Sequence, residues 1–351
     1  MVATQVFQVD PRHPDPRLIE RAAAALREGG LVAFPTETVY GLGANATSAS
    51  AVSRIFVAKG RPASDPIIVH LYDLAQLEQV AADVPGLAFE LARCFWPGPL
   101  TLVLKRSALI PPNVSAGMET VAVRMPDHPV ALALFRVANL PVAAPSANRF
   151  ARPSATAAAH VLEDLGGKVE VILDGGATTI GLESTVLDLT KPAPEVLRPG
   201  GVTLEKLREV IPNVALVSRY LQADEAGIEA PGMLLKHYSP RAELLLFTGE
   251  PEQVIPRMQA AVKEHLAAGR RVGILLPDAE ADLFKGLDVL VFSLGAVENV
   301  AQIGANLFTG LRDLDRRKAD VILARAVARS GLGVAIYDRL LRAAEGRVIA
   351  C

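Results

Sequence analysis

Apolar residues recur at helical spacing in two early stretches of the chain. The stretch from Pro16 to Gly30 ends in a glycine pair, and the stretch from Ser48 to Gly60 begins at a serine N-cap and ends at a glycine. Further helices are expected at 87–96, 129–138 and 155–166. Between them, short apolar runs predict strands at 31–36, 38–46, 66–71, 100–106, 120–126, 141–148, 169–176 and 184–190. Most of these runs are apolar without alternation, which predicts a sheet covered by helices.

The pattern changes after about residue 240. Strands expected at 242–247, 270–277, 288–294 and 319–325 alternate with helices expected at 251–269, 280–286, 299–317 and 334–344. Repeating β-α units with apolar strands are typical of a small parallel, Rossmann-like sheet. The stretch between the two patterns shows no clear period. We therefore expect a catalytic domain over 1–212, a linker over 213–240 and a second α/β domain over 241–351.

Composition and charge narrow the class of protein. The 351 residues are half apolar and carry a net charge of −2, so no global basic field drives nucleic-acid binding. The two cysteines, Cys94 and Cys351, have no metal-binding spacing around them, so no metal ligands are assigned. The N-terminal segment lacks a signal-peptide pattern, and no uncharged apolar stretch of roughly 18 residues is present. These features predict a soluble cytoplasmic protein with no membrane contact.

Lys59 and Arg61 follow an apolar helix and precede a buried strand. A helix C-terminus favours cations whatever their function, so the pair alone does not define a site. Polar side chains also stand where other predicted strands begin or end. They are Thr120, Arg124, Ser146, Asn148, Arg149, Arg152, Ser154, Thr156, Glu183, Ser184, Thr185 and Arg198. Because ligands of open α/β sheets lie at strand ends, and cations with hydroxyl and backbone donors hold phosphates, this set favours a polyanion site.

Familiar nucleotide motifs do not account for these residues. No P-loop pattern occurs. The segment GLGANA, with Gly41, Gly43 and Ala46, fits the dinucleotide pattern G-x-G-x-x-A, and Asp65 follows about 20 residues later. However, PTETVY separates these glycines from the first strand, so relief of crowding in an extended segment is the simpler interpretation.

Five segments in order resemble the threonylcarbamoyl-adenylate synthase (YrdC-like) family. They are FPTETVYGLGANA, KGRP…PIIVH, APSAN…SAT, ESTVLDL and LRPGG, and the pairs Lys59/Arg61 and Ser146/Asn148 match the family's hallmark. The segment PGMLLKHYSPRA and the α/β unit after it resemble the longer, two-domain branch. The resemblance implies a twisted mixed sheet with an open concave site, followed by the Rossmann-like domain. Asp65 stands where many relatives have Asn, so its role at the nucleotide is in doubt.

The resemblance implies an enzyme, a nucleotidyltransferase that joins L-threonine, bicarbonate and ATP. Its products are threonylcarbamoyl-AMP and pyrophosphate, and the former feeds tRNA threonylcarbamoyladenosine modification. ATP is then a substrate, and Mg²⁺ is expected to accompany it. Lys59 and Arg61 are the expected catalytic residues. The expected ATP-binding residues are Arg61, Asp65, Thr120, Arg124, Ser146, Asn148, Ser154, Arg198 and Tyr238, and the expected threonine-binding residues are Thr38, His70, Ala144 and Ser184.

Several alternatives stay open at this stage. His70 at the end of an apolar run is also typical of a satisfied core histidine, Thr38 and Tyr40 of plain sheet residues, and Ser184 of a turn cap. Trp96 is assigned to the core. Two other functions compete: a double-stranded-RNA-binding module without catalysis, and an NAD-dependent oxidoreductase.

The linker is expected to fold over the site as a lid. Met233, Leu234 and Leu235 would then dock in an apolar groove, while Tyr238 and Arg241 point at bound nucleotide and His237 lies beside them. Downstream partners would be the machinery that transfers the threonylcarbamoyl group to tRNA. Direct contact of this chain with tRNA is left open.

Overall fold

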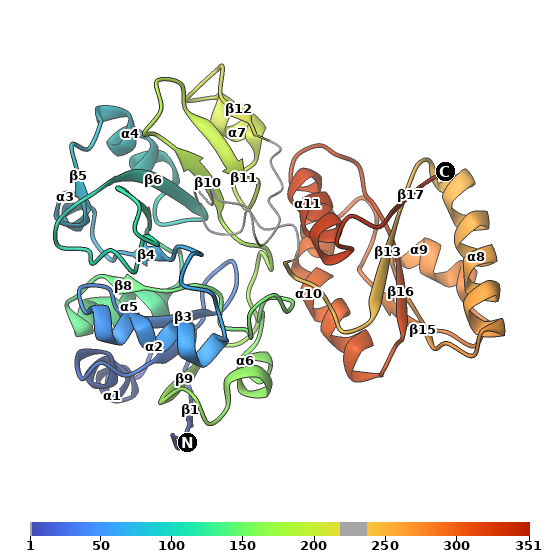
Figure 1. Cartoon of the computed structure of the whole chain (residues 1–351), viewed down its shortest axis with the longest axis horizontal. Coiled ribbons are helices and arrows are strands. Elements are labelled where there is room, and N and C mark those ends of the chain that lie inside the picture. The colour runs from blue at the N-terminus through green and yellow to red at the C-terminus, as the bar shows by residue number, and fades with distance from the viewer. Residues whose placement is uncertain (1, 218–236) are drawn as a thin grey trace. The chain divides into compact units, whose positions relative to one another are not determined.

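The computed structural model describes residues 2–217 and 237–351 of the chain. Within this range the chain divides into two compact units (Figure 1). The first unit contains residues 2–150, 154–179 and 183–217, and the second contains 151–153, 180–182 and 237–351. Two short loop segments from the N-terminal half therefore belong to the C-terminal unit, so the division is not a single cut in the sequence. Met233, Leu234 and Leu235, which the lid hypothesis uses, lie outside the described residues.

One mixed sheet of twelve strands forms the first unit, in the order β1-β9-β2-β3-β8-β4-β7-β6-β10-β11-β12 with β5 paired to β6. Its strands are β1 (Gln5–Gln8), β2 (Val32–Phe34), β3 (Gly41–Asn45), β4 (Ile68–His70), β5 (Ala81–Ala82), β6 (Leu100–Arg106), β7 (Thr120–Arg124), β8 (Val142–Ala143), β9 (Val171–Asp174), β10 (Thr185–Asp188), β11 (Glu195–Arg198) and β12 (Ala215–Leu216). Its helices are α1 (Pro16–Arg27), α2 (Ala49–Lys59), α3 (Leu77–Val80), α4 (Gly86–Phe95), α5 (Pro129–Ala138), α6 (Ala158–Leu165) and α7 (Leu204–Arg208), with a 3₁₀ turn at Leu74–Gln76.

Two core clusters cover the faces of this sheet unequally. On the first face, α2, α4 and α6 pack against alternate residues of most strands, Val69 and Val123 among them. On the second face, α1 and α5 pack against Phe34 and its neighbours on β8 and β9. Side chains alternate between faces along a strand, so the residues next to Val69 and Val123 point to the second face. The apolar ones there, Ile68 and Ala122, belong to neither cluster.

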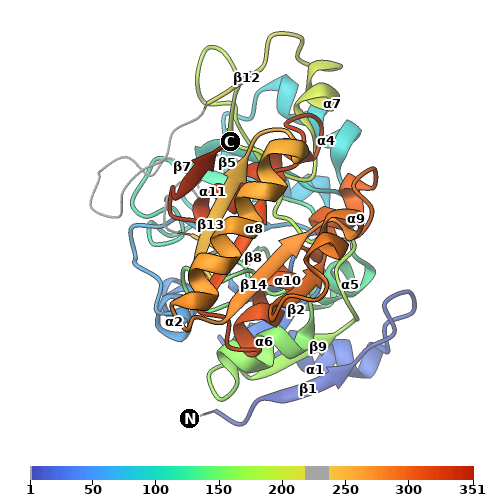
Figure 2. The same cartoon turned by 90° about the vertical axis from the view of Figure 1, so that its right-hand side faces the viewer.

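Five parallel strands form the sheet of the second unit, in the order β15-β14-β16-β13-β17. The strands are β13 (Glu243–Thr248), β14 (Val272–Leu276), β15 (Leu290–Ser293), β16 (Val321–Arg325) and β17 (Val348–Ala350). The helices are α8 (Pro251–Ala267), α9 (Asp278–Ala281), α10 (Val300–Arg316) and α11 (Gly333–Ala343), with a 3₁₀ turn at Asp282–Phe284. Figure 1 shows α8 and α9 on one face and α10 and α11 on the other, and Figure 2 shows α8 in front of β13 and β14.

The predicted fold class is confirmed, with some differences in detail. A mixed sheet and a smaller parallel α/β sheet are both present. The segment expected as a strand at 38–46 pairs only over Gly41–Asn45, because residues 36–40 form a loop. The helix expected at 280–286 is instead a short helix followed by a 3₁₀ turn. Trp96 is 9% exposed and joins the first-face cluster, as predicted. Across 2–217 and 237–351, no helix combines the length and apolar composition that crossing a membrane requires.

Two buried arginines in α11 form ion pairs with the same carboxylate. Arg339 and Arg342 are 0% and 1% exposed, and Asp338 lies 2.7 Å from Arg339 Nη1 and 3.1 Å from Arg342 Nε. We expect Asp338→Ala to lower the free energy of unfolding by about 3–5 kcal/mol, because it removes one partner from buried charges. Urea unfolding followed by circular dichroism measures this. The matched control is Asp282→Ala, which removes an exposed ion pair with Lys285 and should change little. Equal effects of the two substitutions would contradict the prediction.

Candidate active site

The end of α2 is joined to the loop after β8 by a buried ammonium group. Lys59 is the last residue of α2, and Gly60 ends the helix with a left-handed φ of 65°. Lys59 is 4% exposed, and its Nζ donates to the carbonyl oxygens of Ser146, at 2.5 Å, and Asn148. Arg61 follows directly. The two hallmark pairs of the sequence, Lys59/Arg61 and Ser146/Asn148, are therefore brought together.

Arg61 is oriented by the residues at the start of β4. Its Nη2 lies 2.7 Å from Asp65 Oδ1 and donates to the Pro66 carbonyl oxygen at 2.7 Å. Burial raises the pKa of the Asp65 carboxyl, while the nearby charges of Arg61, Lys59 and Arg198 oppose the rise. These three cations therefore lie within electrostatic range of one carboxylate. Asp65 contacts the cation Arg61, which suits a carboxylate because a carboxylate only accepts hydrogen bonds. Its contact with nucleotide stays a prediction.

Strand register separates the predicted residues of β4 and β7 into two levels. The strands are parallel, and His70 stands opposite Arg124. Both point to the second face of the sheet, because Val69 and Val123 point to the first. Thr120 begins β7 and stands at the level of Pro66, beside the Arg61 contact. Thr120 and Arg124 therefore stand at opposite ends of β7, Arg124 together with His70.

His70 is enclosed by aromatic rings and held neutral. It is 4% exposed, and its ring packs edge-on against Phe34 and near Phe135. Burial and the positive charge of Arg124 lower the pKa of His70 to about 3. Its Nδ1 has no hydrogen-bond partner within the part of the chain that the structure describes. A neutral, buried imidazole with an unused nitrogen is suited to bind a ligand.

Arg124 joins three segments at this end of the sheet. Its Nε donates to the Gly98 carbonyl oxygen at 3.2 Å, and its Nη2 lies 2.6 Å from Glu37 Oε1. Arg124 is 4% exposed. Glu37 lies in the loop between β2 and β3, next to Thr38, whose hydroxyl is 2.8 Å from that of Thr36. Sequence reasoning did not select Glu37, although a charged residue inside PTETVY was a signal for it.

Arg198 and Ser184 meet at the start of β10. Arg198 donates to the Ser184 carbonyl oxygen from Nε at 3.1 Å and from Nη2 at 2.9 Å, and to the Ser184 hydroxyl at 3.1 Å. The Ser184 hydroxyl also lies 2.7 Å from that of Thr101 on β6. Thr101 pairs across the sheet with Val186, so it reaches this site only through strand register. The sequence carries no local signal for it.

The contacts of the remaining predicted residues do not show which substrate each of them would bind. Ser154 is fully buried and its hydroxyl donates to Glu183. Asn148 donates from its side chain to the Arg149 carbonyl oxygen. The Ala144 N–H donates to the Ile68 carbonyl oxygen, so this N–H serves the sheet. Tyr238 lies in the second unit with a φ of 62°, its ring beside Phe308 and under Arg339. The expectation that it points at nucleotide stays a prediction.

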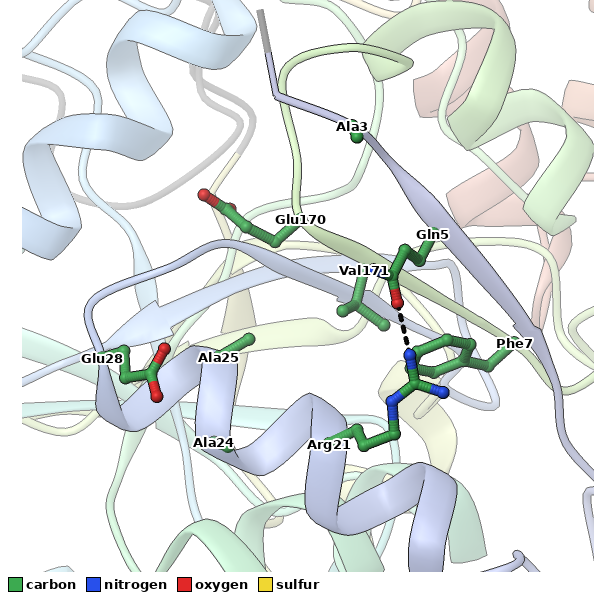
Figure 3. Close-up of a pocket in the computed structure, with 9 residues that line it drawn as sticks. All are labelled: Ala3, Gln5, Phe7, Arg21, Ala24, Ala25, Glu28, Glu170 and Val171. Carbon is green, nitrogen blue, oxygen red and sulfur yellow. Dashed lines mark hydrogen bonds between the residues drawn. The ribbon is translucent and has the colours of Figure 1, made fainter.

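A cavity of about 330 Å³ lies elsewhere in the first unit, between β1, α1 and β9 (Figure 3). Arg21 covers one end, donating to Gln5 and stacking on the Phe7 ring, and Glu28 and Glu170 stand toward the other end. None of the predicted site residues lines it.

The dinucleotide interpretation of GLGANA is wrong. The glycines lie inside β3, which pairs antiparallel with β2, whereas that motif needs a strand-to-helix turn. A Cβ at Gly41 or Gly43 would come within 2.8 Å of the Phe34 ring, so these glycines admit that ring. The cations that the RNA-binding alternative shares with the proposed site, Lys59, Arg61, Arg124 and Arg198, are 4–8% exposed, so these four do not form an exposed basic patch.

Known proteins match this arrangement over nearly the whole chain. The family model described as Telomere recombination matches residues 24–200, and that described as Threonylcarbamoyl-AMP synthase, C-terminal domain, matches residues 202–345. A threonylcarbamoyl-AMP synthase of Pyrococcus abyssi is 46% identical, covering 94% of this chain and 95% of the relative. One of Bacillus subtilis is 46% identical, covering 95% of each chain. The crystal structure of P. abyssi Sua5 complexed with L-threonine has a TM-score of 0.92 at 44% identity, covering 99% of each chain.

A mixed sheet bearing buried cations, followed by a parallel α/β unit, defines a two-domain α/β protein, an architecture shared with the P. abyssi structure. The chain belongs to the threonylcarbamoyl-AMP synthase family. The resemblance seen in the five sequence segments is thereby confirmed.

Gly200, in the segment LRPGG, allows the Arg198 loop to approach Ser184. A Cβ at Gly200 would lie 2.3 Å from the Glu183 carbonyl oxygen and 2.4 Å from the Ser184 carbonyl carbon. We expect Gly200→Ala to destabilise the protein by about 1–3 kcal/mol, because backbone must move. Thermal unfolding measures this. The control is Gly86→Ala at the first position of α4, where a Cβ meets nothing within 4 Å, and it should be neutral or stabilising. A neutral Gly200→Ala would show that the close approach is not required.

His70 should make stability depend on pH. Its pKa is about 3 in the folded chain and near 6.5 when exposed, so the unfolded chain binds the extra proton between these values. The free energy of unfolding should therefore fall as pH falls from about 6.5 toward 3, with a slope from this group of at most about 1.4 kcal/mol per unit. We expect urea unfolding of His70→Gln to show a shallower dependence. His13→Gln, which changes an exposed ring, should keep the wild-type slope. Identical slopes in wild type and His70→Gln would contradict the prediction.

Proposed function

We propose that this chain joins L-threonine, bicarbonate and ATP to give threonylcarbamoyl-AMP and pyrophosphate. Membership of the family supports this proposal, as does the likeness to a relative whose structure is described as complexed with L-threonine. The single observation that carries it is the set of three buried cations, Lys59, Arg61 and Arg198, whose charges all act on the Asp65 carboxyl, with Arg61 in direct contact. Three buried cations in one place are suited to a compact polyanion.

The cations would hold the triphosphate of ATP. Lys59 Nζ and Arg198 donate to neutral carbonyl oxygens, so those bonds fix the side chains without cancelling their charge. Thr120, near Arg61, and Ser146, beside Lys59, would donate hydroxyl hydrogen bonds on the nucleotide side, together with Asn148 and Ser154. The threonine carbamate is a weak, anionic nucleophile. Positioning it in line with the α-phosphate and stabilising charge there would supply most of the catalysis.

Threonine would bind at the level of His70. Thr38, His70 and Ser184 are the proposed contacts, with the backbone around Ala144. Arg124 was predicted on the nucleotide side, but it stands opposite His70 in strand register, and we propose that it binds the threonine carboxylate instead. Ser184, which we propose for threonine, accepts a hydrogen bond from Arg198, which we propose for the nucleotide. Ser184 would therefore stand where the two substrates meet.

Mg²⁺ would enter with the triphosphate. Within residues 2–217 and 237–351 no group of three or more His, Cys, Asp or Glu side chains forms a cage. The buried carboxylates of the site, Asp65 and Glu37, each lie beside an arginine. Because these two carboxylates are paired with arginines, a metal ion here would be held chiefly by phosphate oxygens and water. When bound, Mg²⁺ would neutralise charge on the leaving pyrophosphate.

The product is a labile mixed anhydride, so a second reaction must consume it. We propose that this is transfer of the threonylcarbamoyl group to the adenosine beside the tRNA anticodon, carried out by other proteins in the cytoplasm. Salt-dependent tRNA binding by this chain, measured alongside turnover, would decide whether it contacts tRNA itself.

Lys59→Ala and Arg61→Ala should each reduce pyrophosphate release by roughly a hundredfold, about 2.7 kcal/mol at the transition state, because each removes charge stabilisation. The assay supplies threonine, bicarbonate and ATP, and circular dichroism checks the fold. Lys105→Ala is the matched control, since its ammonium is exposed and pairs with exposed Asp83. Wild-type rates in both site variants would overturn the catalytic assignment.

A further inference from the structure

A buried carboxylate oxygen at the threonine end of the site has no hydrogen-bond donor. Glu37 is 6% exposed, and its Oε1 lies 2.6 Å from Arg124 Nη2. No side chain or backbone group among residues 2–217 and 237–351 donates to its Oε2. A carboxylate oxygen withdrawn from water costs free energy unless a donor satisfies it. Its position therefore indicates a ligand that brings one.

The surroundings of Glu37 place it among the threonine-side residues. Arg124, its ion-pair partner, stands opposite His70 in the sheet. The loop after β7 lies within electrostatic range as well. Burial and then the charge of Glu37 raise the pKa of Asp127, and burial lowers the pKa of His128 while Glu37 opposes that change. Glu37 is thus ion-paired with Arg124, and its charge also acts on Asp127 and His128.

We propose that Glu37 Oε2 binds the α-ammonium group of L-threonine, an inference that rests on the proposed function. An α-amino acid carries its ammonium and carboxylate on one carbon. A receptor for it therefore needs a negative and a positive group side by side. Glu37 and Arg124 supply such a pair, with charged atoms 2.6 Å apart. Charge-assisted hydrogen bonds of this kind give both affinity and selection for the amine.

A purely structural role for Glu37 makes a different prediction. If Glu37 only holds Arg124 in place, its loss weakens every ligand that has a carboxylate. If it binds the ammonium group, its loss weakens only ligands that have the amine. The compound (R)-3-hydroxybutanoate separates the two, because it keeps the carboxylate, hydroxyl and methyl groups of threonine and lacks the amine.

The experiment compares dissociation constants of L-threonine and (R)-3-hydroxybutanoate for the full-length protein, by ligand-detected NMR without ATP. The wild type should prefer threonine at least tenfold. Glu37→Gln should reduce this preference to within about threefold and leave the hydroxy acid affinity unchanged. Glu37→Asp keeps the negative charge and should retain a preference of several-fold. Equal weakening of both ligands by Glu37→Gln, or an unchanged preference, would overturn the proposal, as would loss of preference in Glu37→Asp.

Controls separate this inference from the function on which it rests. Glu28→Gln removes an exposed carboxylate at the end of α1 and should change neither dissociation constant, and thermal unfolding checks that all variants fold. A wild type that binds no threonine and releases no pyrophosphate with threonine, bicarbonate and ATP would overturn both proposals. A wild type that does both, with Glu37→Gln as selective as wild type, would overturn only the assignment of Glu37.

Discussion

The buried ammonium group of Lys59 is the contact on which the architecture of the site depends. A lysine with its charge removed from water needs nearly all of its hydrogen bonds satisfied. Here two backbone carbonyl oxygens, of Ser146 and Asn148, accept them. The end of α2 and the loop after β8 are thereby held together across 87 and 89 residues of sequence. Because these two acceptors are neutral, the two bonds fix geometry without themselves supplying a counter-charge.

Two arginines of the site are also held by backbone carbonyl oxygens, but with a carboxylate beside each. They are Arg61 and Arg124, and the carboxylates beside them are Asp65 and Glu37 respectively. The balance of charge differs between the two ends of the sheet. At one end three cations act on the single carboxylate of Asp65, and at the other end Arg124 is matched by Glu37. Strong positive charge is useful for a triphosphate, whereas a zwitterion needs both signs. His70 and Arg124 lie on the second face of β4 and β7, where the apolar residues Ile68 and Ala122 belong to neither core cluster.

Much of the fold was predictable, and the reasons differ between elements. The β-α alternation after residue 240 and the helix ending at Gly60 follow from local spacing and capping, which the sequence displays directly. Strands β1, β5 and β12 were not predicted, because pairing with distant partners and not local pattern defines them. In the site, Lys59 and Arg61 were recognisable as a pair. Thr101 was not, since only the register of β6 with β10 brings it to Ser184. Glu37 carried a local signal as a charged residue inside PTETVY, but its contact with Arg124 joins segments far apart in the sequence.

The division of the chain has a consequence for how the two units could be separated. Residues 151–153 and 180–182 belong to the C-terminal unit, yet their neighbours in sequence, Ser154 and Glu183, are bonded to each other in the first. Arg312 of α10 donates to the Pro153 carbonyl oxygen at 2.6 Å. A chain ending near residue 212 would keep both loops and lose what they pack against. A sequence that encodes the first unit alone would therefore have to satisfy the Pro153 carbonyl oxygen and cover both loops without residues of the second unit.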